Sequence, residues 1–438
     1  MECHTYSFND RARVGGAVIA THSIISIRES IFENNGAEVG GALFVNHSSV
    51  TIDNTTFTEN HGNGGGVSVF MITLGGALYQ KESHVTITSS HFSNNTASYG
   101  GAVFAVLETL SIYNGSQVDD NTAERGGAMY SLNCNVTIDG SQFDNNTAAT
   151  HGGVLISYGG TIKIDGSQFD NNIATIAGGA LCSYSSTITI DGSQFEDNTA
   201  KYGGALFYFN STITTDGSLF DNNTATSEGG VLYSNGSNIT IDGSQFDNNT
   251  AIYGGALYSN SSTITVDGSQ FDNNTATKYG GALYSNSGTI MVDRSQFDNN
   301  MATNNGGALY SDRNTITVDR SQFDSNTATS GGTLYSYSST ITINESQFDN
   351  NTAIYGRGAL HSYNDTITID SCKFANNSAV AIFYLVRCCV VIKGNTTFQA
   401  TWDPCWLSTV ISLLKAVLFL KITLYSIMLQ LITKKEVQ

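Results

Sequence analysis

Residues 254–279 read GGALYSNSSTITVDGSQFDNNTATKY, and close copies of this stretch recur along most of the 438-residue chain. The Gly-Gly pairs follow one another at intervals of 25 or 26 residues, apart from one interval of 35 that contains an extra glycine run at 64–66. Such a fixed period is the signature of a repeat architecture. The pairs begin at Gly15, Gly40, Gly75, Gly100, Gly126, Gly152, Gly178, Gly203, Gly229, Gly254, Gly280, Gly306 and Gly331, and a broken copy reads Gly356-Arg357-Gly358.

Within a unit, the stretch Thr-Ile-Thr-Ile alternates polar and apolar branched residues, which is typical of a half-buried strand. We expect Ile188 and Ile190 to point inward and Thr187 and Thr189 outward. Gly-Gly-Ala-Leu-Tyr and Ser-Gln-Phe-Asp-Asn form two further short runs bounded by turn-forming residues. The sequence therefore predicts three strands per unit and no helix within the repeats.

A unit of this length cannot bury its own apolar face, so it must stack on copies of itself. Three-strand coils wound into a parallel β-helix satisfy this need, and about fourteen coils at ~4.8 Å each make a rod of roughly 65–70 Å. A propeller is the rival fold, but its blades need ~40–45 residues. We expect an incomplete N-terminal coil at 1–14, the β-helix at 15–400 and a hydrophobic tail at 401–438.

Stacking converts each sequence column into a ladder of equivalent side chains. The aliphatic residue after Gly-Gly-Ala and the recurring Phe are predicted to form the dry core, with Val118 replacing Phe once. The third residue after Phe is Asn, which is expected to sit at a coil corner in left-handed geometry and to bond the next Asn. The Phe ladder comprises Phe143, Phe169, Phe195, Phe220, Phe246, Phe271, Phe297, Phe323, Phe348 and Phe374. The Asn ladder comprises Asn146, Asn172, Asn198, Asn223, Asn249, Asn274, Asn300, Asn326, Asn351 and Asn377.

Paired Gly-Gly-Ala-Leu and Phe-x-x-Asn motifs, such as 178–181 with 195–198 and 254–257 with 271–274, recur in phase over about residues 15–380. In this respect the chain resembles the passenger region of the chlamydial polymorphic outer membrane proteins. The resemblance implies a right-handed parallel β-helix that is displayed outside a cell and used in adhesion. That family also carries a signal peptide and a C-terminal β-barrel, and the sequence predicts neither here.

The formal charge of −18 and a pI near 4.6 make nucleic acid an improbable partner. Most carboxylates are periodic, so no pair stands out from its column as a catalytic acid and base. We therefore expect a protein that is not an enzyme, with a carbohydrate-active β-helix enzyme as the alternative. One carboxylate column comprises Asp139, Asp165, Asp191, Asp216, Asp242, Asp267, Asp293 and Asp319; the other comprises Asp144, Asp170, Asp221, Asp247, Asp272, Asp298, Asp324 and Asp349.

These acidic columns have two interpretations. Stacked carboxylates ~5 Å apart repel one another, and a divalent cation would relieve the repulsion. The loops lack the Gly-Gly-x-Gly-x-Asp repeat that holds calcium in other β-helices, so solvated acidic faces are favoured over a calcium ladder. We accordingly expect no cofactor, with calcium as the alternative.

Two outward columns have functional interpretations. Thr-x-Thr pairs such as Thr187 and Thr189 resemble the ice-binding face of antifreeze solenoids, although threonine is also an ordinary strand residue. Aromatic residues follow the buried Leu and either form a contact surface for a protein or glycan or simply shield the sheet. The candidate contact stripe comprises Tyr233, Tyr258, Tyr284, Tyr310 and Tyr335.

The tail differs in composition from the repeats. Residues 407–432 are long and apolar enough to span a bilayer, but Lys415 and Lys421 lie near the middle and oppose insertion. A membrane anchor, a helix that caps the open end of the solenoid and an artefact of the gene model all remain open. Taken together, the sequence predicts an adhesive β-solenoid at a cell surface, with a host or neighbouring cell-surface protein or glycan as partner.

Overall fold

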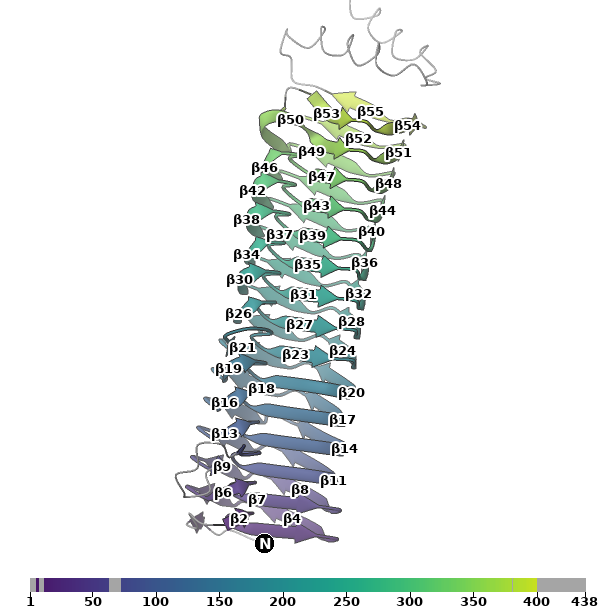
Figure 1. Cartoon of the computed structure of the whole chain (residues 1–438). Coiled ribbons are helices and arrows are strands. Elements are labelled where there is room, and N and C mark those ends of the chain that lie inside the picture. The colour runs from purple at the N-terminus through teal and green to yellow at the C-terminus, as the bar shows by residue number, and fades with distance from the viewer. Residues whose placement is uncertain (1–4, 8–11, 63–71, 380, 400–438) are drawn as a thin grey trace, which may run out of the picture.

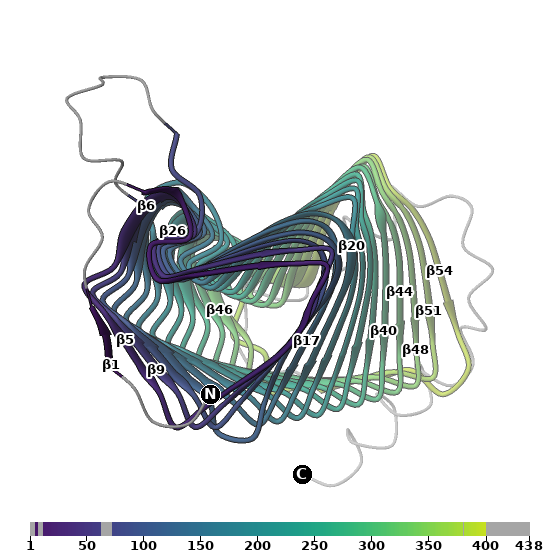
Figure 2. The same cartoon turned by 90° about the horizontal axis from the view of Figure 1, so that it is seen from below.

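The computed structural model describes residues 5–7, 12–62, 72–379 and 381–399. These residues form a rod of stacked coils whose strands pair in parallel with the equivalent strands of neighbouring coils (Figure 1). Figure 2 looks along the rod and shows the coils lying one behind another, each turned slightly relative to the previous one. The predicted parallel β-helix is confirmed. The described residues contain strands, turns and bends but no helix.

One coil has four strands where the sequence predicted three. In the unit at 254–279 they are β35 (Leu257–Asn260), β36 (Thr263–Asp267), β37 (Gln270–Asp272) and β38 (Thr275–Tyr279). The additional strand is the Thr-Ala-Thr-Lys-Tyr segment. Its apolar content is low, with only Ala276 fully buried, so alternation alone did not reveal it. It becomes a strand because it is held between its copies in adjacent coils.

The strands form two sheets. The Phe-bearing strands stack into a sixteen-stranded sheet that runs from β1 (Thr5–Ser7) to β55 (Thr397–Gln399). The other three strand positions form a second sheet of 39 strands. In four coils near the N-terminal end the first two strand positions merge into single strands of 11 residues: β11 (Leu78–Thr88), β14 (Val103–Tyr113), β17 (Met129–Asp139) and β20 (Leu155–Asp165).

In most units the difference between 25 and 26 residues arises in one strand position; in the unit at 100–125 the extra residue lies in the turn between β14 and β15 (Gln117–Asp119). β34 (Thr250–Tyr253) has 4 residues, whereas its neighbour β38 has 5. Tyr253 nevertheless pairs with Tyr279, because a β-bulge between Ala251 and Tyr253 absorbs the additional residue. The register of every other column is thereby preserved.

The interior is built from the predicted ladders. Members of the Phe ladder are at most 3% exposed and stack face to face, with ring centroids 4.6–5.2 Å apart. Val118 lies between Phe92 and Phe143 in this column. Ile188 and Ile190 are buried, and Thr187 and Thr189 are exposed. The aliphatic column after Gly-Gly-Ala is also buried: Leu78, Val103, Met129, Leu155, Leu181, Leu206 and Leu257.

The Asn ladder lines one buried corner of the coils. Asn274 donates from Nδ2 to the Phe246 carbonyl at 2.7 Å and to Asn300 Oδ1 at 3.0 Å. The backbone N–H of Asn274 also donates to Asn300 Oδ1 at 3.1 Å. Because each rung repeats these bonds, the buried amides are satisfied by the coils on either side.

The expected left-handed geometry of these ladder residues is wrong. The residue with positive φ is the one before the ladder Asn: Asn273 has φ 54°, whereas Asn274 lies outside this region. The chain turns at the exposed first Asn, which leaves the second Asn free to point into the corner and reach the next coil.

Some of the sequence predictions concern residues that the structure does not describe. The predicted hydrophobic helix at 401–438, including the possible membrane segment 407–432, lies outside the described residues, as does the glycine run 64–66. Of the predicted N-terminal coil 1–14, the described parts are β1 and β2 (Ala12–Val14), which pair with the first complete coil.

Candidate functional site

The tyrosines of the candidate contact stripe lie on the outer face of successive strands. They occupy β31 (Leu232–Asn235), β35, β39 (Leu283–Asn286), β43 (Leu309–Asp312) and β47 (Leu334–Tyr337), in each case after the buried Leu. All five rings are partly exposed. From Tyr233 to Tyr335 the centroids of successive rings are 5.1, 4.9, 4.8 and 5.3 Å apart, with nearly parallel planes.

The column of rings extends beyond these five residues. We use the term aromatic stripe for Phe44, Tyr79, Phe104, Tyr130, Phe207, Tyr233, Tyr258, Tyr284, Tyr310 and Tyr335. Phe207 stacks on Tyr233 at 4.9 Å. The four rings from Phe44 to Tyr130 stack at 5.0–5.6 Å. Both stretches of the stripe are therefore continuous stacks of rings.

Two non-aromatic residues, Ile156 and Cys182, occupy the column between these stacks and are buried. Tyr158 and Tyr184, two residues further along the same strands, bridge the gap. Tyr158 lies 5.8 Å from Tyr130 and 4.9 Å from Tyr184, and Tyr184 lies 5.9 Å from Phe207. Ring contacts thus run without a break from Phe44 to Tyr335.

A second row of tyrosines packs beside the stripe. Tyr202, Tyr253 and Tyr279 directly precede Gly-Gly pairs, and their rings lie 5.6 Å from Tyr233, 5.8 Å from Tyr284 and 5.0 Å from Tyr310. The outline of the coils bends inward between β26 (Thr199–Tyr202) and the face that carries β20 (Figure 2). The sharp turn at Gly-Gly brings the residue before it toward a stripe residue of the next coil. This row was not predicted, although the recurring Tyr-Gly-Gly is its visible signal.

Burial moves the pKa of several stripe phenols further above neutral pH. It raises the pKa of Tyr284 to about 12, with a smaller contribution from the charge of Asp312. The pKa of Tyr130 is likewise raised to about 12, mainly by burial. Burial is also the main cause of the raised pKa of Tyr258 and Tyr310. At neutral pH the stripe therefore presents aromatic rings and O–H groups without charge of its own.

Charged groups lie at the edge of the stripe. Lys278 Nζ donates to the Tyr253 hydroxyl at 3.2 Å and lies 5.3 Å from the ring centroid. Lys201 lies 4.9 Å from the centroid of Tyr202. The site therefore combines stacked rings with cations held against rings of the second row, a combination that binds apolar and polar groups together.

The two acidic columns lie on other faces and differ in their surroundings. In the first, Arg320 Nη2 contacts Asp293 at 2.6 Å and its Nε contacts Asp319 at 3.1 Å. In the second, burial and then repulsion from Asp272 and Asp221 raise the pKa of Asp247 to about 6. The pKa of Asp298 is raised for the same reasons. Within the described residues, no group of three or more His, Cys, Asp or Glu side chains is placed to hold a metal ion.

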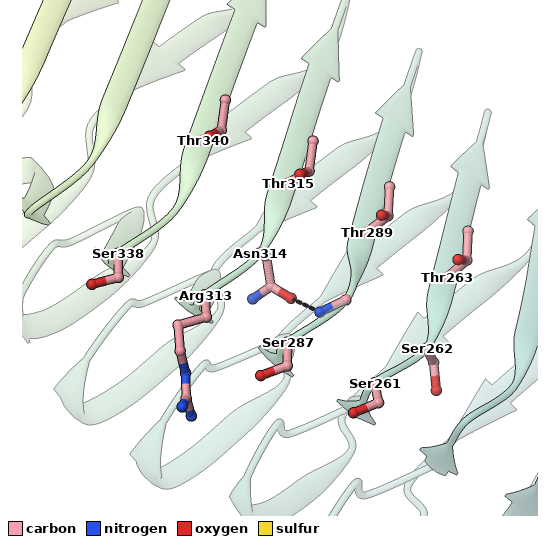
Figure 3. Close-up of a pocket in the computed structure, with 11 residues that line it drawn as sticks. Ser261, Ser262, Thr263, Ser287, Thr289, Arg313, Asn314, Thr315, Ser338 and Thr340 are labelled. Carbon is pink, nitrogen blue, oxygen red and sulfur yellow. Dashed lines mark hydrogen bonds between the residues drawn. The ribbon is translucent and has the colours of Figure 1, made fainter.

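A shallow groove of about 430 Å³ runs along the corner between the first two strand positions (Figure 3). Serines and threonines line most of it, and the row of Thr263, Thr289 and Thr315 forms one side. Asn314 Oδ1 accepts a hydrogen bond from the Gly288 N–H at 2.6 Å, so the carboxamide occupies the place of the serine found elsewhere in this column. No carboxylate or imidazole lines the groove, and its chemistry is hydrogen bonding.

The geometry defines the class of protein: a parallel β-solenoid with ladder-forming repeats and an aromatic outer face. The family model described as right handed beta helix region matches residues 15–180, 133–297 and 290–398. The chain belongs to this family, and its coils are right-handed. No curated protein matches the chain. The family includes enzymes and non-enzymes. Membership therefore establishes the fold but does not decide the activity.

None of the described residues belongs to a helix that could serve as a membrane span.

Proposed function

We propose that this chain is a non-enzymatic β-solenoid that acts at an extracellular or outer membrane-like cell surface and binds a partner through the aromatic stripe. The partner is a protein or glycan of a host or neighbouring cell. The repeated Gly-Gly-Ala and Phe-x-x-Asn motifs, which resemble those of the chlamydial polymorphic outer membrane proteins, support display and adhesion as the role of the rod.

The observation that carries this proposal is the unbroken series of ring contacts along the outer face. Phe104 and Tyr130 are buried, but the rings from Phe207 to Tyr335 are all partly exposed. A single exposed ring on a soluble protein needs no explanation, whereas a row of partly exposed rings is typical of an interaction surface. Tyrosine supplies a large contact area at low cost in side-chain entropy, together with a hydroxyl that forms hydrogen bonds. The stripe is thus suited to an extended partner that lies along several coils.

The same surface argues for binding without catalysis or a cofactor. Catalysis needs a pair of groups whose surroundings differ, so that one serves as acid and the other as base. The carboxylates of this chain instead recur in columns with similar neighbours, as Asp247 and Asp298 illustrate. Stripe phenols with a raised pKa are suited to hydrogen bonding and poorly suited to act as bases at neutral pH.

The test is binding of the purified chain to cells or extracellular matrix. Replacement of Tyr258 and Tyr284 by Ala removes two adjacent rings from the stripe. Buried aromatic contacts of this kind dominate interface energies, so we expect the double variant to bind at least about 30-fold more weakly. Tyr258→Phe, which retains the ring, is expected to lose much less.

The matched control replaces Thr263 and Thr289 by Ala, since these outward residues lie on the next strand of the same coils. Binding of this control is expected to stay within about twofold of the parent. Unfolding of each variant in urea is measured in parallel. If the tyrosine variant is destabilised but binds undiminished, or if the parent binds no surface, the rings only shield the sheet and the proposal is wrong.

A further inference from the structure

The core columns are open at the C-terminal end of the rod. The last coil contains β53 (Ala381–Val386), β54 (Cys389–Lys393) and β55, and these lie at the top of Figure 1. They pair with β50 (Thr352–Tyr363), β51 (Thr366–Asp370) and β52 (Lys373–Ala375) on one side. No other described strand pairs with their outer edge. Among the described residues, the backbone groups and core side chains of this coil therefore have no partner strand on that side.

The difference in burial between the last two coils is large. Phe374 is 0% exposed, whereas Phe398, its partner in the same ladder, is 39% exposed. Ile369 is buried, but its partner Ile392 is only partly so. Side chains in columns that are closed in the interior coils thus reach solvent here.

The last coil is also more apolar at its core positions than the coils beneath it. Leu385 pairs with Ser362 and so replaces serine in an inward column. Phe383 pairs with Leu360 and places a larger ring in the aliphatic column. Phe383 lies 5.5 Å from Phe398, edge to face. We define the end face as Phe383, Leu385, Val390, Ile392 and Phe398.

A surface of this kind in a repeat protein needs a cover, since an open terminal repeat exposes core and unpaired strand edges. The chain itself continues from this coil with residues 400–438, a segment rich in Leu, Ile, Val and Phe. Its connection to Gln399 holds it beside the end face at a high effective concentration. We propose that residues 401–438 pack on the end face and cap the solenoid within the same molecule.

Charge favours this occupant over a lipid bilayer. Lys415 and Lys421 lie near the middle of the apolar stretch, where a charged side chain is costly to insert into a membrane. On a cap, long side chains of this type lay their stems along apolar surface and keep their ammonium groups in water. The inference is independent of the aromatic stripe and of any partner.

The experiment compares the full chain with a chain that ends at Gln399. Amide hydrogen exchange is measured at β53, β54 and β55, with the central coils as internal reference. We expect removal of the tail to speed exchange in the last coil by at least about tenfold, because its opening becomes easier, and to leave the central coils unchanged. Equal exchange in the two chains would overturn the proposal.

Two substitutions in the full chain provide a matched pair. Ile392→Lys places a charge on the end face, whereas Val391→Lys places it on the outer side of the same strand, where Val391 is already 49% exposed. The first variant is expected to exchange like the truncated chain and the second like the parent. Thermal unfolding of the whole rod checks that neither substitution prevents folding.

If something other than the tail of the same molecule covers the end face, the experiments give different results. If the tail spans a membrane, the full chain floats with phosphatidylcholine vesicles and the truncated chain does not. If a second copy covers the end face, protection of the last coil depends on protein concentration and the full chain sediments as a dimer. Either result would overturn an intramolecular cap, for which we expect a monomer that stays out of the vesicle fraction.

Discussion

Two adjacent residues, both asparagine in most coils, have different roles at one corner of each coil. Asn273 adopts the left-handed conformation and is exposed, whereas Asn274 is buried and spans the gap to the next coil. The Oδ1 atom of Asn274 accepts two bonds from Asn249, from its backbone N–H and from Nδ2. One side chain therefore satisfies groups in the coils above and below.

We expect Asn274→Ala to lower the free energy of unfolding by about 3 kcal/mol, because it leaves the Phe246 carbonyl and donors of Asn249 buried without partners. Urea unfolding followed by circular dichroism measures this loss. Asn273→Gly is the control, since glycine adopts left-handed geometry freely, and we expect a change below about 0.5 kcal/mol. Similar losses in both variants would contradict a special role for the ladder.

The second glycine of each Gly-Gly pair has no room for a side chain. A Cβ on Gly255 would lie 2.0 Å from the carbonyl oxygen of Gly281 in the next coil. The atoms that the added Cβ would meet belong to the backbone of the neighbouring segments, so relief requires the coils to separate. We expect Gly255→Ala to destabilise the rod by about 3 kcal/mol or more.

Gly268 is the matched control for this substitution. Its φ is +55°, but only Asp242 Oδ1 lies near the site of an added Cβ, at 3.9 Å. The equivalent corner positions in later coils hold Arg294 and Arg320 with positive φ. We therefore expect Gly268→Asn to change the free energy of unfolding by less than about 1 kcal/mol. A larger loss there than at Gly255 would show that backbone conformation, and not crowding, decides the cost.

At the scale of the strand, the Phe-bearing sheet places a carboxylate on the outer edge of every rung from Asp119 to Asp349. Asp247 lies between Asp221 and Asp272 in register. Asn248 Nδ2 donates to Asp221 Oδ1 at 2.9 Å, and Asn299 Nδ2 donates to Asp272 Oδ1 at 3.0 Å. Amide donors thus offset the negative charge of the carboxylates on either side of Asp247. The carboxyl group with the raised pKa is that of Asp247 itself.

This arrangement predicts that the rod gains stability on mild acidification. The pKa of Asp247 is raised from 3.8 to about 6 in the folded chain, so the folded state binds the proton more tightly than the unfolded state. The associated stability is present below about pH 4 and is lost as the pH rises through about 6. We expect the urea midpoint to increase between pH 7 and pH 5.

Asp247→Asn is expected to raise the urea midpoint at pH 7 and to reduce its change between pH 7 and pH 5. Asp242→Asn, an exposed residue of the other acidic column, is the control and is expected to leave the pH dependence in place. If both variants flatten the profile equally, overall charge and not the local ladder is responsible.

At the scale of the whole molecule, each coil contacts its neighbours and the rod is close to one-dimensional. Deletion of residues 254–279 joins Tyr253 to Gly280 and removes one full turn without shifting any column. Globular chains gain about 0.05–0.15 kcal/mol per residue, so we expect a loss of about 1–4 kcal/mol with cooperative unfolding retained. Circular dichroism during urea unfolding tests this.

Deletion of residues 254–266 provides the contrast. It removes half a turn, so the remaining Gln-Phe-Asp strand cannot lie over its copies while the chain still closes the coil. We expect this shorter deletion to abolish the native β signal or to cause aggregation. A folded half-turn variant as stable as the full-turn one would refute the stacking of equivalent residues.

Much of the fold could be predicted because the repeats of one chain can be aligned with one another, which shows which positions are equivalent. Once identical units stack, a residue type that recurs in one place must form a column, and its polarity decides whether the column faces inward. The burial of the Phe and aliphatic columns and the outward Thr residues follow from this rule. The strand at β38 escaped prediction, since it carries little apolar alternation and gains its conformation from pairing with its copies.

The candidate site was only partly predictable. Its column of tyrosines is visible in the sequence as the residue after each buried Leu. The bridge formed by Tyr158 and Tyr184 is not, because it depends on which rings reach across Ile156 and Cys182. Nor does local sequence show that Tyr202 and Tyr279 meet the stripe, since the turn angle at Gly-Gly is set by the stacked backbone.

The sequence by itself determined the period, the parallel stacking and the identity of the core columns, because period and polarity are properties of order along a chain. Only the tertiary structure decided which residue of each corner turns the backbone, how many strands a coil contains, where the additional residue of the longer units is absorbed and which rings touch. These features depend on angles and distances between segments of different coils, and such contacts exist only once the chain has closed on itself.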